Sequence, residues 1–198
     1  MARRSCFDFS SSAEESQFHE QMVSALLKTI LFTVFVPGTV TVVVPYYLLS
    51  SRRGAVILSL GFFHYLAVPV LLLGAAMYGW CAWDFASAGR GTPAPIDPPK
   101  QLVIRGLYHY VRNPMYISVL LVLLGEALLF QARILLEYTL EVFAFFFLFV
   151  LIYEEPALRK KFGESYDRYC ATVPPWIPSL RRGKPERVKS RTFDKIWR

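Results

Sequence analysis

The chain has 198 residues, of which 54% are hydrophobic and 16% aromatic, and its formal net charge is +7. A water-soluble domain of this length cannot bury so large an apolar fraction, so the composition argues against one. Crossing about 30 Å of hydrocarbon takes roughly 20 apolar residues. Four apolar segments approach or exceed this length, namely 25–49, 55–83, 115–130 and 134–153. We therefore predict an all-α integral membrane protein with about four transmembrane helices.

The placement of the 22 Lys and Arg residues predicts how these helices are oriented. Basic residues flank the start of the first segment, lie between the second and third, and are most frequent after the fourth. The positive-inside rule then places both termini and the central loop in the cytosol, with two short turns outside. We expect a multi-pass protein of a bacterial inner membrane. The basic tail follows a membrane helix directly, which predicts contact with anionic lipid head groups and no binding of nucleic acid.

The chain divides into four expected parts. Residues 1–24 form a cytosolic N-terminal segment, 25–83 the first two transmembrane helices, 84–178 a core with a transmembrane hairpin, and 179–198 a basic tail. The last two apolar segments are separated only by residues 131–133, which predicts a tight helical hairpin. Proline removes a backbone hydrogen bond, so kinks are expected at Pro37-Gly38 and at Pro69.

Cysteine and histidine give no sign of a metal site. Cys6, Cys81 and Cys170 lack paired spacing, and the three histidines do not cluster with them, so neither a disulfide framework nor bound zinc is predicted. His64 lies inside the second apolar segment, where a polar side chain is costly unless it has a partner. We expect it to be a packing residue with a hydrogen bond.

The start of the third helix carries more polar residues than a helix cap needs. Asn113 before Pro114 is a good helix start, because an Asn side chain can cap free amides and proline suits the first helical position. The cap does not require Arg112 before it, Tyr116 one turn later, or Tyr108 behind a glycine. These residues are candidates for a site at the membrane surface.

The far end of the hairpin carries a pair of carboxylates, in Glu154-Glu155-Pro156. An amphipathic segment follows as far as about Val173, with apolar residues at helical spacing, and it should lie on the cytosolic surface. Two antiparallel spans joined by a tight outer turn end at the same face of the membrane. We therefore predict that the Arg112 motif and the glutamate pair are neighbours.

A guanidinium, free amides, aromatic rings and two carboxylates could together hold a zwitterionic, nucleotide-like cofactor. The sequence contains neither a G-x-G-x-x-G nor a Walker motif, so a Rossmann-type cofactor domain is not predicted.

At these residues the chain resembles the isoprenylcysteine carboxyl methyltransferases and the related phospholipid methyltransferases. Their pattern is L-V-x-x-G-x-Y-x-x-x-R-H-P-x-Y, followed later by E-E. The chain matches it with Leu102-Val103, Gly106, Tyr108, Arg112-Asn113-Pro114, Tyr116 and Glu154-Glu155. The likeness covers roughly residues 100–178.

The resemblance implies S-adenosylmethionine as methyl donor. The residues that it implies in cofactor binding are Lys100, Gln101, Leu102, Val103, Tyr108, Arg112, Asn113, Pro114, Met115, Tyr116 and Glu154. Asn113 replaces the histidine that is usual in the family, so a titrating base at that position is excluded. No catalytic residue and no metal ligand are assigned.

The resemblance further implies a lipophilic acceptor at the membrane surface. Carboxyl O-methylation of a prenylcysteine-like substrate is the favoured reading, and a phospholipid amine is a second one. Val150 stands where the eukaryotic isoprenylcysteine enzymes carry a substrate-binding arginine, which speaks for a different lipophilic acceptor. Two alternatives to a methyltransferase are an NADPH-dependent membrane reductase and a non-enzymatic membrane protein.

Three carboxylates lie in or near the outer half of the hairpin, where burial of charge is costly. They are Glu126, Glu137 and Glu141, and Arg133 is expected to neutralise one of them. Glu141 is the deepest. The resemblance implies no role for it, and it is left outside the predicted site.

Overall fold

The computed structural model describes residues 30–31, 33–51, 61–88 and 104–179. These residues form helices, turns and short irregular segments, and no strand occurs among them, which confirms the all-α prediction. The α-helices are α2 (Val44–Ser50), α3 (Ala67–Ala88), α4 (Pro114–Phe130), α5 (Arg133–Phe149), α6 (Glu155–Phe162) and α7 (Glu164–Thr172). Shorter elements are the π-helical turns Thr39–Val43 and Val150–Glu154 and the 3-10 helices Gly61–Leu66 and Gly106–His109.

Three helical stretches of the described chain are long and apolar enough to cross a membrane, namely Thr33–Ser50, Gly61–Asp84 and Arg133–Phe162. The apolar helix α4 is shorter, with 17 residues. These stretches correspond to the four predicted segments, including the short third one. The stretch Arg133–Phe162 joins α5, a π-helical turn and α6 over 30 residues. Its length of about 45 Å exceeds the hydrocarbon thickness, so its end with α6 extends beyond the bilayer core.

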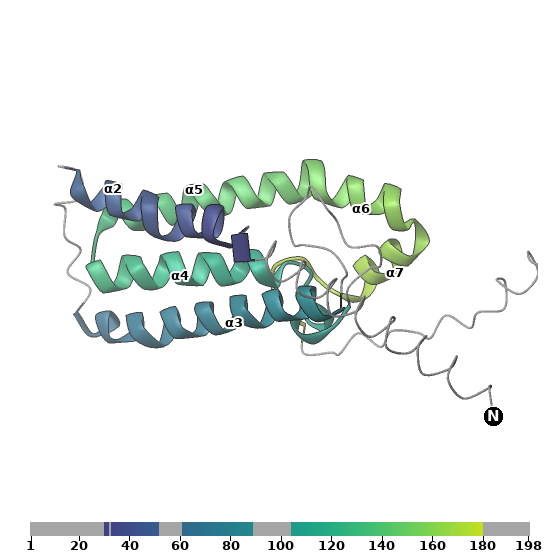
Figure 1. Cartoon of the computed structure of the whole chain (residues 1–198), viewed down its shortest axis with the longest axis horizontal. Helices are drawn as coiled ribbons and strands as arrows, with labels where there is room; N and C mark the ends of the chain where they lie inside the picture. The colour runs from purple at the N-terminus through teal and green to yellow at the C-terminus, as the bar shows by residue number, and fades with distance from the viewer. Residues whose placement is uncertain (1–29, 32, 52–60, 89–103, 180–198) are drawn as a thin grey trace, which may run out of the picture.

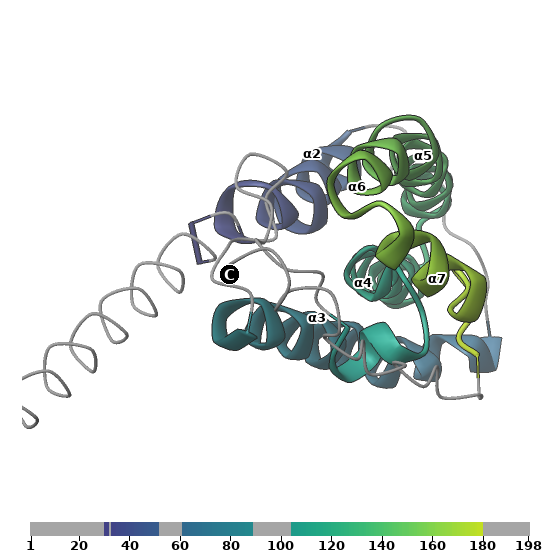
Figure 2. The same ribbon diagram turned by 90° about the vertical axis from the view of Figure 1, so that its right-hand side faces the viewer.

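The long helices form a bundle in which α4 packs between α3 and α5, with α2 beside α5 (Figures 1 and 2). Helices α4 and α5 are antiparallel and joined at Gln131 and Ala132, so the predicted tight hairpin is confirmed. The hairpin turn lies at one end of the bundle, and α6 and α7 lie at the other (Figure 1).

Each of the two sites at which a proline kink is predicted lies beside an irregular helical turn. Pro37-Gly38 is followed directly by the π-helical turn Thr39–Val43. The 3-10 helix Gly61–Leu66 ends just before Pro69, whose ring conflicts with the carbonyl four residues earlier and so disturbs the preceding turn. His64 Nδ1 lies 3.2 Å from the carbonyl oxygen of Leu128, which confirms its expected role as a hydrogen-bonded packing residue.

The amphipathic segment after Pro156 is two helices, because the chain breaks at Gly163 between α6 and α7. The apolar face of α7 buries Tyr166, Tyr169 and Val173, which pack against Ile104 and Leu158. This packing holds α7 against the polypeptide that leads into α4.

Candidate functional site

A cavity of about 400 Å³ lies between the first helix of the bundle, the helical stretch Thr33–Ser50, and helices α4 and α5. This volume falls in the range of small-molecule sites, which is roughly 300–1,000 Å³. Most of its wall is apolar and includes Val36 and Val40 from the first helix, Val119 from α4, and Val142 and Phe146 from α5. Its polar side chains come from the segment before α4, from the start of α4 and from the turn after α5, together with Tyr78 of α3 and Glu141 within α5.

The cavity gathers six of the cofactor-binding residues predicted from the sequence. They are Tyr108, Arg112, Asn113, Met115, Tyr116 and Glu154. Pro114 is fully buried at the start of α4 and is absent from the cavity wall. Lys100, Gln101, Leu102 and Val103 lie outside the described residues.

The two ends of the hairpin meet at Tyr116 and Glu154. The phenol of Tyr116 donates a hydrogen bond of 2.7 Å to Oε2 of Glu154, and its ring packs on Phe146 with centroids 4.7 Å apart. This contact confirms that the motif at the start of α4 and the glutamate pair are neighbours. The hydrogen bond and the ring contact hold both side chains in the cavity wall.

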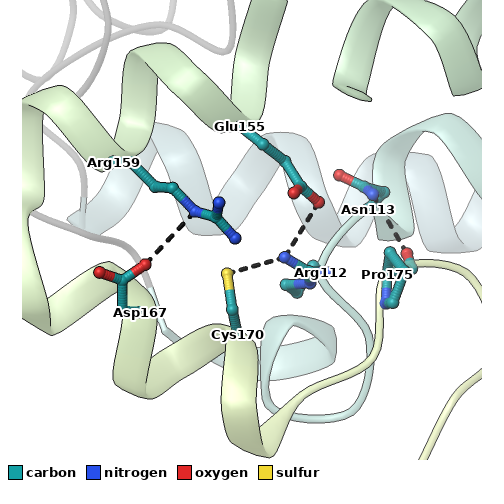
Figure 3. Close-up of polar contacts among 7 residues, drawn as sticks. All are labelled: Arg112, Asn113, Glu155, Arg159, Asp167, Cys170 and Pro175. Atoms are coloured by element: carbon teal, nitrogen blue, oxygen red, sulfur yellow. Dashed lines mark hydrogen bonds and ion pairs between the residues drawn. The ribbon is translucent and has the colours of Figure 1, made fainter. Parts of the chain in front are cut away.

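Arg112 is held by a partner that the sequence motif did not identify. Its Nη1 lies 3.0 Å from Oε1 of Glu155 and donates to Sγ of Cys170 at 2.7 Å (Figure 3). The side chains of Arg112 and Glu155 are only 12% and 16% exposed, so the pair is largely shielded from solvent. Glu154 and Glu155 therefore have different partners, because adjacent helical residues point in different directions.

The side chain of Asn113 does not cap α4, which corrects the prediction made from the Asn-Pro pair. Instead its Nδ2 donates to the carbonyl oxygen of Pro175 at 3.2 Å. The neighbouring amide of Arg112 donates to the carbonyl oxygen of Pro174 at 2.9 Å. The segment after α7 thus supplies the acceptors that fix the entry to α4, and long-range contacts replace the local cap.

Tyr108 is placed by close packing against α3 and α7. Its carbonyl oxygen accepts a 2.8 Å hydrogen bond from the phenol of Tyr169. Gly106, two residues earlier, has φ of +52°, and a Cβ there would overlap the carboxylate of Asp84 on α3. Only glycine fits such a close approach in this backbone conformation. Burial raises the pKa of Tyr108 well above its ordinary value, so its phenol is a neutral donor at physiological pH.

The helix that carries the glutamate pair is irregular where it passes the cavity. Residues Val150–Glu154 form a π-helical turn between α5 and α6. Such turns are rare and occur frequently at functional sites, because the extra residue changes the direction of the side chains that follow. Here the turn ends at Glu154, the residue that contacts Tyr116.

Glu141 is a cavity residue that the sequence reasoning left out. It lies on α5 and contributes to the wall near Val142 and Phe145. The sequence did indicate a functional position here, because Glu141 is a carboxylate inside an apolar helix. Arg133 neutralises a different carboxylate, that of Glu137, at 2.8 Å.

The described residues thus define an all-α membrane protein with a largely apolar cavity, whose guanidinium, phenols and carboxylates come from α3, the segment before α4, α4, α5 and the π-helical turn that follows α5. A model of the phospholipid methyltransferase family matches residues 62–165, slightly more than half of the chain. The chain therefore belongs to the phospholipid methyltransferase family. No curated protein matches it significantly. The match includes α3, α4 and α5 and ends within α7, so it contains all the cavity-lining residues from Tyr78 onward.

Proposed function

We propose that the protein is an S-adenosylmethionine-dependent methyltransferase that acts on a lipophilic acceptor at the membrane surface. The observation that carries this proposal is the contact between Tyr116 and Glu154 in the cavity wall, which joins the two separated parts of the family motif. The apolar remainder of the wall suits a lipid-like acceptor.

The cavity residues fit the proposed cofactor in their chemistry. The Nε of Arg112 is buried and has no hydrogen-bond partner among the described residues, although Nη1 of the same guanidinium is bonded. A buried donor without a partner is costly, so an acceptor group on a ligand, such as a carboxylate, would complete it. Glu154 offers acceptor oxygens for hydroxyl or amino groups. Contacts of adenine with residues 100–103 remain a prediction from the family resemblance.

S-adenosylmethionine would supply an electrophilic methyl group for an in-line displacement. The contribution of the chain is then to bind, to orient and to exclude water from the acceptor. A carboxylate acceptor is ionised at neutral pH and needs no general base, whereas an amine must first lose a proton. Oε1 of Glu155 forms an ion pair with Nη1 of Arg112 at 3.0 Å, so we assign Glu155 to positioning that side chain and not to proton removal.

The side chain at position 150, a valine, bears on the choice between a carboxylate acceptor and a lipid amine. This side chain is only 4% exposed, and it stands where the eukaryotic isoprenylcysteine enzymes carry a substrate-binding arginine. It offers no charge to a prenylcysteine carboxylate. Carboxyl O-methylation therefore needs another cation in this chain, while a lipid amine does not.

The proposed orientation keeps both termini in the cytosol, so that the end of the bundle with α6 and α7 faces a water-soluble cofactor. The basic segment 179–198 would then lie next to anionic head groups. Both points rest on the distribution of Lys and Arg in the sequence.

The proposal is tested with the purified full chain by calorimetric titration with S-adenosylhomocysteine and, separately, with NADPH. We expect binding of S-adenosylhomocysteine and a loss of affinity of about tenfold or more in Tyr116→Ala. The matched control is Tyr153→Ala, because Tyr153 is 55% exposed and is not part of the cavity wall. Binding of NADPH alone would support the reductase reading, and binding of neither ligand would contradict the proposal.

A further inference from the structure

Glu141 lies deep in the membrane-spanning part of α5. It follows the first residue of α5, Arg133, by eight positions, which corresponds to about 12 Å along a helix axis. That depth is close to the middle of a hydrocarbon core about 30 Å thick. A carboxylate at this depth is costly, and such residues commonly face a cavity and interact with a substrate or ion.

The surroundings of Glu141 differ from those of its neighbour Glu137. Glu137 is paired with Arg133 at 2.8 Å near the end of the helix. The ion pairs within the described part of the chain involve Arg112, Arg133, Arg159 and Arg168, and none of them reaches Glu141. Glu141 instead lines the cavity beside the apolar side chains of Val142 and Phe145. Its charge therefore lacks a counterion in this part of the chain.

The charges around the cavity favour one kind of acceptor. The wall contains the carboxylates of Glu141 and Glu154 and a single guanidinium, that of Arg112. The charge of Arg112 is offset by Glu155 at 3.0 Å. A negatively charged acceptor would be repelled by the carboxylates of Glu141 and Glu154, which line the same largely apolar cavity. An acceptor with an ammonium or another strong hydrogen-bond donor would meet a partner.

We propose that Glu141 is a specificity-determining residue that pairs with a cationic or hydrogen-bond-donating group of the lipophilic acceptor and disfavours carboxylate acceptors. This inference rests on the proposed function and names the acceptor chemistry of the same cavity. Because Glu141 and Glu154 are 13 positions apart along nearly continuous helix, roughly 20 Å, the two carboxylates serve different ends of the cavity. Glu154 belongs to the surface end and Glu141 to the end within the bilayer.

The test uses the full chain in phosphatidylcholine nanodiscs, titrated with dodecylamine or with dodecanoate and corrected with empty nanodiscs. These probes share one chain length and differ in the charge of the head group. We expect wild type to bind the amine at least tenfold more tightly than the carboxylate, and Glu141→Gln to lose this preference. Glu141→Asp should keep it, because the charge is retained. Glu137→Gln is the matched control on the same helix and should also keep it.

Titration of the same samples with S-adenosylhomocysteine and S-adenosylmethionine separates this inference from the proposed function. Unchanged affinity for both cofactors in Glu141→Gln, together with lost amine preference, supports the assignment to the acceptor. Weaker binding of S-adenosylmethionine alone would assign Glu141 to the sulfonium charge and overturn the inference. An amine preference that survives in Glu141→Gln would overturn it as well. If wild type binds neither cofactor, the proposed function fails, whereas the amine preference is still measured.

Discussion

The two adjacent glutamates, Glu154 and Glu155, should respond differently to the same substitution. Glu154 accepts a hydrogen bond from Tyr116 and faces the cavity, while Glu155 pairs with Arg112. In Glu154→Gln the amide oxygen can still accept from Tyr116, so we expect the free energy of unfolding to change by less than about 1 kcal/mol. Loss of charge-assisted bonds to the cofactor should lower affinity by about tenfold to a hundredfold.

Glu155→Gln should act mainly on stability. Removing one partner of a buried ion pair costs roughly 3–5 kcal/mol, because the other charge is left without compensation. The Arg112 and Glu155 side chains are 12% and 16% exposed, and a glutamine can still accept a hydrogen bond, so a loss of about 2–3 kcal/mol is expected. Neutralising the cation as well, in Arg112→Met with Glu155→Gln, should recover part of this loss.

The free energy of unfolding is measured by denaturation with SDS in mixed micelles, and cofactor affinity by titration with S-adenosylhomocysteine. The double variant completes a thermodynamic cycle whose coupling term isolates the ion pair. If both glutamates were simply solvated charges, Glu154→Gln and Glu155→Gln would have equal effects on stability and on cofactor affinity. Equal effects would therefore refute the division of roles. A coupling term near zero would refute the ion pair as a source of stability.

Two further predictions concern the bundle and its orientation. A Cβ on Gly74 of α3 would lie 2.9 Å from the backbone oxygen of Ser118 on α4. We therefore expect Gly74→Ala to lower the free energy of unfolding by about 1–3 kcal/mol. The control is Gly79→Ala, because Gly79 is exposed and a Cβ there would meet nothing within 4 Å. Reporter fusions at Ser51 and after Arg198 should report opposite sides of the membrane, and a common side would contradict the proposed topology.

Much of the architecture follows from the order of residues along the chain. Apolar length predicts the membrane helices, since a spanning helix must satisfy its own backbone in lipid. The separation of two spans by residues 131–133 then requires an antiparallel hairpin, which brings Tyr116 to Glu154. This juxtaposition was predictable because hairpin geometry needs no knowledge of side-chain packing.

Six of the residues that the family motif marks line one cavity, but the motif does not show what each of them touches. The partner of Asn113 is Pro175, beyond α7, and a local pattern cannot reveal so distant an acceptor. The hairpin places Arg112 near the glutamate pair, but the sequence does not show that Glu155, and not Glu154, forms the ion pair with it.

The position of Glu141 shows the same limit. Its depth within an apolar helix was evident from the sequence alone, whereas its place on the cavity wall depends on how α5 packs against the first helix and α4. The sequence by itself therefore determined the helices, their antiparallel hairpin and the set of polar residues at its end. Only the tertiary structure decided the partners of those residues, because the rotation of each helix about its axis is set by packing contacts between distant segments.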